Sequence, residues 1–418
     1  MKDFKSLNPT IQLRIFMNFL GALTFSTVGS AMTIYYNKYL GAGITGVLLI
    51  ISSVLVFFAG LYAGHLSDRR GRRPVMLIST AGSVLGGLIA TLSNSPWFFD
   101  AWTTYFGFLL MNFSFGFFNT ASGAMIVDLT DETNRRVVYS IQYWALNLGI
   151  LIGSALSGIF FRDFLFELLL AITLQELLAF FLVYFKIPES FDPSKSPAKQ
   201  ENIFKAYRIV SKDKTFMIYC FASVFIAMIF SQVDYYLPVH LSDSFRTTHI
   251  FGIEIYGQRM LSLILITNTL LIVFLMSFIN HLTKNWTRSR GMGVGMIIQG
   301  GGFIIAFIGR DFTTEMIAAL VLTLGEMIVV PFSQALRADL MEGDRVGTYT
   351  GVFNVTQTIG TILCGMMLSG SAIVGNPGMV ALMGLIVILG VVPSQIAIRR
   401  HENPKLEKSV ALDSVSDK

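Results

Sequence analysis

Long apolar segments of about twenty residues recur along nearly the whole chain, and short polar stretches separate them. An α-helix rises about 1.5 Å per residue, so about 20 such residues cross a hydrocarbon core of about 30 Å. The pattern predicts twelve membrane-spanning helices, at about 12–37, 43–66, 74–94, 101–127, 136–161, 163–186, 213–239, 255–281, 291–309, 314–340, 346–371 and 377–398. We therefore expect an all-α membrane protein.

One polar stretch interrupts this pattern near the midpoint of the chain. Residues 187–212 hold three prolines and several lysines and are predicted to be a cytoplasmic linker. An N-terminal six-helix bundle then covers 1–186 and a C-terminal six-helix bundle covers 213–398. Residues 399–418 form a polar tail.

The two halves resemble each other in sequence. Asp128 and Asp339 each lie at the end of the fourth helix of their half and are 211 residues apart, and Gly149 and Gly360 keep the same separation. Repeats of this kind indicate two pseudo-symmetric bundles related by an axis along the membrane normal.

The basic residues explain the orientation of the helices. Of 31 Lys and Arg residues, 25 fall on the two termini and on every second loop, whereas the other loops hold four. The positive-inside rule then predicts that both termini are cytoplasmic. The net charge of +5 reflects this topology, so we expect no nucleic-acid partner.

Composition excludes several other classes of protein. Charged residues make up only 14% of the chain, against about 25% in soluble domains, which predicts a multi-pass membrane protein. Cys220 and Cys364 lie within predicted spans, and the five histidines lack metal-ligand spacing, so we expect neither disulfides nor a metal. No nucleophile–base set is present, so we do not expect an enzyme, and Gly291–Gly295 is interpreted as a helix start rather than a phosphate loop.

Acidic residues within the spans are the first candidates for function, because a charged group at the bilayer centre costs about 2.5–3.5 kcal/mol. Glu326 lies near the middle of the tenth helix and Asp234 near the outer end of the seventh. Each carboxylate can hold either a proton or a cationic substrate, and this competition is the basis of antiport. Packing specificity for Glu326 and simple hydration for Asp234 are the alternatives. Glu176 is a weaker candidate, because the sixth helix is expected to lie outside the cavity.

The hinge, Gly64–Pro74, places four arginines and Asp68 between the second and third helices. Asp68, Arg69 and Arg72, with Asp128 at the end of the fourth helix, are predicted to form a gate or proton relay. A cluster that only sets topology is the alternative. The corresponding loop of the second half, His281–Gly291, has no aspartate, and its charge suits topology alone.

Two motifs carry a family resemblance. The hinge spacing G-x-L-x-D-R-x-G-R-R resembles the loop 2–3 signature of the major facilitator superfamily. The small-residue stripe Gly149–Gly158 resembles the superfamily's antiporter signature, although Ser154 and Ser157 replace a proline and a glycine. A plain packing face is the alternative for this stripe. The fourth helix lacks the basic residue that many antiporters carry there, since Met111–Gly116 offers none.

Over nearly its whole length the chain resembles the multidrug/proton antiporters of this superfamily, those of lactococci in particular. The resemblance implies a twelve-helix exporter of lipophilic cations in the bacterial cell membrane, with protons as the coupling ion and no other cofactor. Asp68, Asp128, Asp234 and Glu326 match acids of that pattern. Gln142 stands where those relatives have an aspartate, which leaves the proton stoichiometry open.

Aromatic and amide residues are candidates for lining a cavity that binds flat cations by cation–π contact, at about 0.5–2 kcal/mol each. Anchoring at the membrane interface is the alternative. The candidates are Tyr35, Asn119, Gln142, Trp144, Asn147, Tyr235 and Asn354, with Arg259 as a neutralising cation or outer gate. We expect proton-driven multidrug efflux by alternating access in a functional monomer that also contacts membrane lipids. A lipid or lysolipid translocase and a proton-coupled nutrient importer are the rival hypotheses.

Overall fold

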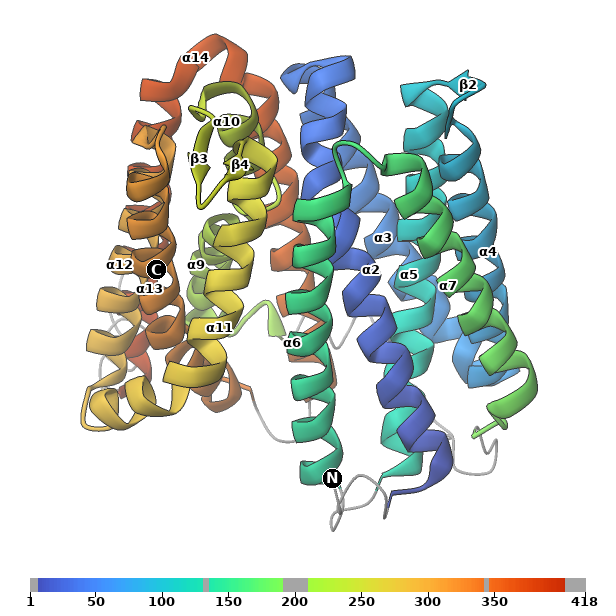
Figure 1. Ribbon diagram of the computed structural model, residues 1–418. Helices are drawn as coiled ribbons and strands as arrows, with labels where there is room; N and C mark the ends of the chain where they lie inside the picture. Colours follow the sequence, from blue (N-terminus) through green and yellow to red (C-terminus); the bar gives the residue numbers. More distant parts are fainter. Residues whose placement is uncertain (1–6, 131–134, 191–209, 342–345, 403–418) are drawn as a thin grey trace, which may run out of the picture. The chain divides into compact units, whose positions relative to one another are not determined.

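A computed structural model describes residues 7–130, 135–190, 210–341 and 346–402. Nearly all of this chain is helical, and two short hairpins join helices (Figure 1). The hairpins are β1 (Asn94–Ser95) with β2 (Phe98–Phe99), and β3 (Thr248–Ile250) with β4 (Ile253–Ile255). The helices are α2 (Pro9–Leu40), α3 (Ala42–Arg70), α4 (Arg72–Leu92), α5 (Ala101–Leu129), α6 (Arg135–Phe160), α7 (Leu165–Lys186), α9 (Lys214–Ser231), α10 (Tyr236–Ser244), α11 (Gly257–Thr283), α12 (Arg288–Ile308), α13 (Phe312–Asp339) and α14 (Val346–Glu402).

Ten helical segments in these ranges are long and apolar enough to cross a membrane. One of them, Thr348–Glu402, contains two of the predicted spans, because Gly375 interrupts α14 with φ 63° and ψ 179°. This backbone conformation suits glycine, which has no Cβ. Helix α5, which has 29 residues, is a long helix in addition to these ten segments. The predicted all-α membrane architecture is confirmed.

The chain divides into two compact units. The first unit contains 1–198 and 255–269, and the second contains 199–254 and 270–418, so the start of α11 groups with the first. The first unit has a core that includes Met32, Tyr36 and Leu169. The second has a core that includes Phe216 and Met296.

Polar caps fix where several helices begin. The Asp100 carboxylate accepts a hydrogen bond of 2.6 Å from the Thr103 N–H at the start of α5. Asp213 accepts one of 2.9 Å from the Phe216 N–H at the start of α9. Such caps satisfy backbone donors that the first helical turn leaves without a partner.

The seventh predicted span, 213–239, is not one continuous helix. α9 ends at Ser231, a turn follows, and α10 begins at Tyr236. Pro238 explains the interruption, because its ring has no N–H and would collide with the carbonyl four residues earlier, at Asp234. The break therefore places Asp234 on an irregular segment, and the prediction of an unbroken helix was wrong.

The small-residue stripe of α6 packs against α2. A Cβ on Gly149 would lie 2.7 Å from the Phe19 carbonyl oxygen, and one on Gly153 would lie 2.6 Å from that of Leu23. The hydroxyls of Ser26 and Ser154 are 2.7 Å apart across the same interface. Small residues thus bring the two helices into close contact, as they do in many membrane proteins.

Candidate functional site

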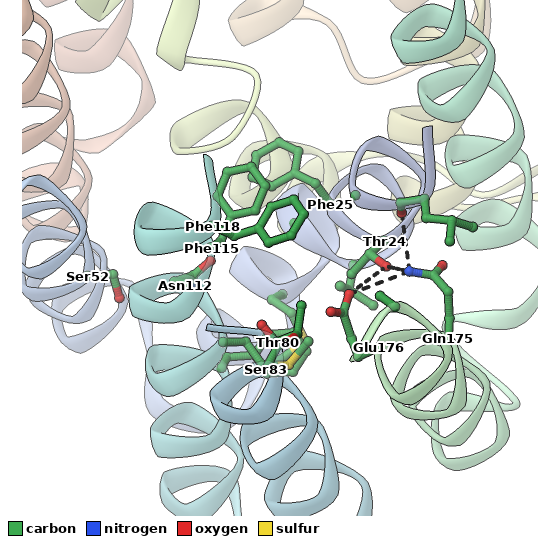
Figure 2. A pocket seen from close by; sticks show the side chains of 18 of the residues that line it. Thr24, Phe25, Ser52, Thr80, Ser83, Asn112, Phe115, Phe118, Gln175 and Glu176 are labelled. Carbon is green, nitrogen blue, oxygen red and sulfur yellow. Dashed lines mark hydrogen bonds between the residues drawn. The ribbon is translucent and has the colours of Figure 1, made fainter. Parts of the chain in front are cut away.

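A cavity lies within the first unit, between α2, α3, α4, α5 and α7 (Figure 2). It contains about 1020 Å³ of empty space, counted out into the solvent at its opening. Its wall is mainly apolar and aromatic. The aromatic side chains on the wall are Phe25, Tyr36, Tyr105, Phe108, Phe115 and Phe118.

Helix α2 faces the cavity with one stripe of residues. Met17, Gly21, Thr24 and Val28 follow each other at spacings of three and four, so they lie on the same side of the helix. Figure 2 shows Phe25 of α2 beside Phe115 and Phe118 of α5. The aromatic wall is therefore formed by two helices that are far apart in sequence.

Glu176 of α7 is the acid of this cavity. The Thr24 hydroxyl donates to the Glu176 Oε1 at 3.4 Å. The Gln175 amide donates to Thr24 Oγ1 at 2.6 Å and to Glu176 Oε1 at 3.5 Å, as the dashed lines in Figure 2 indicate. The described residues that line the cavity include no lysine, arginine or histidine.

The sixth predicted helix, expected to lie outside the transport cavity, is α7, and it contributes Gln175, Glu176 and Ala179 to the wall of this pocket. The sequence did contain a signal, since two adjacent polar residues occur in the middle of an otherwise apolar helix. Their pairing with Thr24 depends on tertiary contacts, which the sequence pattern did not reveal.

The hinge residues form a connected cluster where α3 ends and α4 begins. Arg72 is 9% exposed, and its guanidinium bonds to Asp68 at 2.6 Å and to Asp128 at 3.1 Å. A third bond of 3.2 Å reaches the Ser67 hydroxyl. Arg69 is exposed and lies outside these contacts. The structure thus brings together three of the four predicted gate residues.

Glu189 also belongs to this cluster, and sequence reasoning missed it. Its two carboxylate oxygens accept hydrogen bonds from the Arg72 N–H at 2.9 Å and the Arg73 N–H at 3.1 Å. A negative charge is favourable at a helix N-terminus. Gly71 has φ 97°, and a Cβ there would lie 2.7 Å from the Glu189 Cδ, so both backbone and space require glycine.

The chain after α7 adds a second contact to the cluster. The Ser190 hydroxyl donates to Asp128 at 3.1 Å. The side chains of Arg135 and Arg136, which follow Asp128 closely in the sequence, lie outside the described residues, as does most of the predicted linker. The segment was predicted only to join the halves, but its first residues bind the hinge.

The two acids predicted for the second unit lie on different elements. Asp234 is half-buried in the turn between α9 and α10. Glu326 is half-buried on α13, directly after Gly325, where a Cβ would overlap the backbone of Gln299 on α12. The close approach of α12 and α13 therefore fixes the position of Glu326.

The predicted cavity residues of the first half have other surroundings. The Tyr35 hydroxyl donates to Asn94 at 3.0 Å, within the network at the β1–β2 hairpin, whereas its neighbour Tyr36 lines the cavity. Asn147 donates to the Tyr143 carbonyl oxygen at 2.8 Å. The backbone oxygen of Gln142 accepts from Asn18 at 3.5 Å.

The remaining candidates are spread over both units. Asn119, Trp144 and Asn354 are exposed. Tyr235 is buried and precedes α10. Arg259 donates to the Gly158 carbonyl oxygen at 3.0 Å, and its guanidinium lies 5.0 Å from the Tyr256 ring centroid. These contacts place Arg259 against α6.

The chain is similar to known proteins in sequence and in fold. The model of the family described as Major Facilitator Superfamily matches residues 15–258 and 248–414. A "Na(+), Li(+), K(+)/H(+) antiporter" of Planococcus maritimus is 25% identical over 375 residues, which cover 86% of this chain and 88% of that protein. The class C tetracycline resistance protein of Escherichia coli is 25% identical over 367 residues, covering 85% and 86%.

Solved structures of similar fold include a POT family transporter in complex with a thioalcohol-conjugated peptide. It superposes with a TM-score of 0.75 and covers 96% of this chain and 99% of its own, at 13% sequence identity. At this identity the likeness shows the fold alone.

Proposed function

Because the chain belongs to the Major Facilitator Superfamily, we propose that it exports lipophilic cations in exchange for protons. The observation that carries this proposal is Glu176, an acid set in an aromatic cavity whose described lining holds no basic residue. The resemblance to lactococcal multidrug antiporters supports the same function. So do the relatives named for antiport and for tetracycline resistance.

The chemistry of the cavity favours exchange. An ionised carboxylate in an apolar wall is costly, so Glu176 is neutralised either by a proton or by a bound cation. The two ligands exclude each other at one carboxylate, and this couples their movements. Phe25, Phe115 and Phe118 add flat surfaces that attract organic cations at about 0.5–2 kcal/mol each.

The other acids extend this mechanism. Asp234 and Glu326 are proposed to bind protons or substrate in the second unit. The bonds of Arg72 to Asp68 and Asp128 are proposed to hold one conformation of the transporter until protonation releases them. Proton entry is an adequate driving force, since moving one charge across 100 mV gains about 2.3 kcal/mol.

Exchange of alkali cations for protons is the second candidate, because the Planococcus maritimus relative carries that name. Small hard cations prefer several oxygen ligands, whereas this cavity offers one carboxylate and a largely apolar wall. Lipophilic cations suit such a wall better. A lipid translocase or a nutrient importer of the same fold would differ from this antiporter in the direction of the proton flux that accompanies the substrate, or in whether such a flux occurs.

Efflux from energised membrane vesicles tests the proposal. We expect Glu176→Gln to reduce ethidium efflux by at least about tenfold, because glutamine cannot exchange a proton for a cation. Glu167→Gln is the matched control, since Glu167 lies on the same helix but is exposed, and it should retain efflux. Full efflux in Glu176→Gln, or sodium uptake without ethidium efflux in the wild type, would overturn the proposal.

A further inference from the structure

Arg14 lies on the stripe of α2 that faces the cavity, one turn before Met17. Its spacing to Met17, Gly21 and Thr24 continues the same pattern of three and four residues. The side chain is 0% exposed. A fully buried arginine at the edge of a cavity whose lining is otherwise without a cation calls for an explanation.

The contacts of Arg14 are weak for a cation. Its Nη1 lies 3.8 Å from the Met17 Sδ, and its Cζ lies 5.1 Å from the ring centroid of Phe118. Its Nε has no hydrogen-bond partner, and no carboxylate of the described residues pairs with it. A thioether is a weak acceptor, so Met17 satisfies its donor on this guanidinium poorly.

Such a group is matched to an anion. Arginine binds carboxylates and phosphates through two parallel hydrogen bonds, and burial strengthens that attraction. Met17 and Phe118, which the guanidinium contacts, both line the cavity. Methionine is unbranched and flexible, so it can move aside for a ligand.

We propose that Arg14 binds the carboxylate or phosphate group of an amphipathic substrate whose cationic group lies at Glu176. The inference rests on the proposed function, and it names zwitterions as a substrate class of the same cavity. Ten residues separate Arg14 from Thr24, which contacts Glu176, or about 15 Å along α2. Helix α5 is the fourth predicted helix, which lacks the basic residue that many antiporters carry there. Arg14 of α2 would supply a cation next to α5, because it lies beside Phe118 of that helix.

Binding to the purified full chain in detergent tests this inference without requiring transport. Quenching of tryptophan fluorescence would be titrated with ethidium, a cation, and with norfloxacin, which carries a carboxylate and a protonated amine. We expect Arg14→Gln to weaken norfloxacin binding at least about tenfold and ethidium binding less than about twofold. Arg14→Lys should recover part of the norfloxacin affinity, because it restores the charge without the planar fork.

Two controls separate anion binding from a structural role. Arg337→Gln removes an arginine that lies 4.8 Å from a phenylalanine ring in the second unit and should leave both affinities unchanged. Arg14→Met should keep or raise the melting temperature, because it removes an unpaired buried charge. Equal loss of both probes, no loss of norfloxacin, or a lower melting temperature in Arg14→Met would overturn the inference.

Two further measurements test whether the anion comes from a substrate or a lipid, and whether Glu176 binds the cation. If Arg14→Gln weakens norfloxacin binding in detergent but not in nanodiscs that contain phospholipid, a lipid phosphate occupies Arg14 in the membrane and the substrate assignment is wrong. Glu176→Gln should weaken ethidium binding. If it does not, the proposed cation site fails, while the norfloxacin result still decides the role of Arg14.

Discussion

The two halves of the chain build the same junction with different chemistry. In the first unit, Arg72 at the start of α4 bonds to Asp128, and Glu189 from the segment after α7 caps that helix. In the second unit, Arg288 at the start of α12 pairs with Asp339, the residue 211 positions after Asp128. There Gln395 of α14 bonds to Ser289. A charged contact in one half is therefore a neutral amide contact in the other.

The loop of the second half, His281–Gly291, has specific contacts of its own. Its basic residues were predicted to suit topology alone, but Arg288 has an acidic partner, and Arg290 lies 4.4 Å from the Trp286 ring centroid. Among the residues that the structure describes, the second junction shows no counterpart of Asp68 and no carboxylate at the cap. The first junction thus holds the larger set of charges that protons or salt can disturb, which suits it to gating.

Removing the central arginine should show the largest difference between the halves. Arg72→Gln leaves Asp68 and Asp128 close together without a cation, and we expect a loss of about 1–3 kcal/mol of unfolding free energy and a strong loss of turnover. Arg288→Gln breaks a pair whose side chains are 36% and 39% exposed, so we expect about 0–1 kcal/mol. Thermal unfolding in detergent, with efflux assays, measures both. Equal losses in the two variants would contradict the asymmetry.

Exchanging the capping residues should have an intermediate effect. Glu189→Gln removes a charge from the N-terminus of α4, where a carboxylate is worth about 0.3–1 kcal/mol, and should slow turnover a few-fold at low salt. High salt should make the wild type resemble this variant, because ions screen exposed charges. The reciprocal variant, Gln395→Glu, should add salt dependence to the second junction. Efflux rates that ignore ionic strength in all three proteins would refute this explanation.

The smallest effect concerns a feature that the two halves share. Asp100 and Asp311, 211 residues apart, cap α5 and α13. Hydrogen bonds from the Thr103 and Thr314 side chains, and from their N–H groups, lower the pKa of each carboxyl below 3.8. A lowered pKa means that the contribution to stability is complete above the usual aspartate pKa and is lost as the pH falls through the lowered value.

Asn substitution isolates this titration, because asparagine keeps a capping oxygen but has no ionisable group. Asp100→Asn and Asp311→Asn should each reduce the fall in melting temperature on going below pH 4, by similar small amounts. A large difference between the two would show that the caps are not equivalent.

Hydrophobic runs were sufficient to predict the spans, since most predicted bounds fall within the observed helices. The sequence also revealed Asp68, Arg72 and Asp128, because a dense charge cluster between apolar runs is visible locally. It did not reveal Glu189, whose role depends on a fold that returns the chain after α7 to the start of α4. Nor did it place Glu176, whose partner Thr24 is 152 residues away. The break at Asp234 was predictable from Pro238, but the apolar run concealed it.

The central claim is that one carboxylate, Glu176, holds either a proton or a lipophilic cation. Proton release on substrate binding tests it most directly, by adding ethidium to weakly buffered purified protein and following a pH-sensitive dye. We predict that the wild type releases protons when ethidium binds and that Glu176→Gln releases measurably fewer. Equal proton release by the two proteins would show that the exchange occurs elsewhere and would contradict the account.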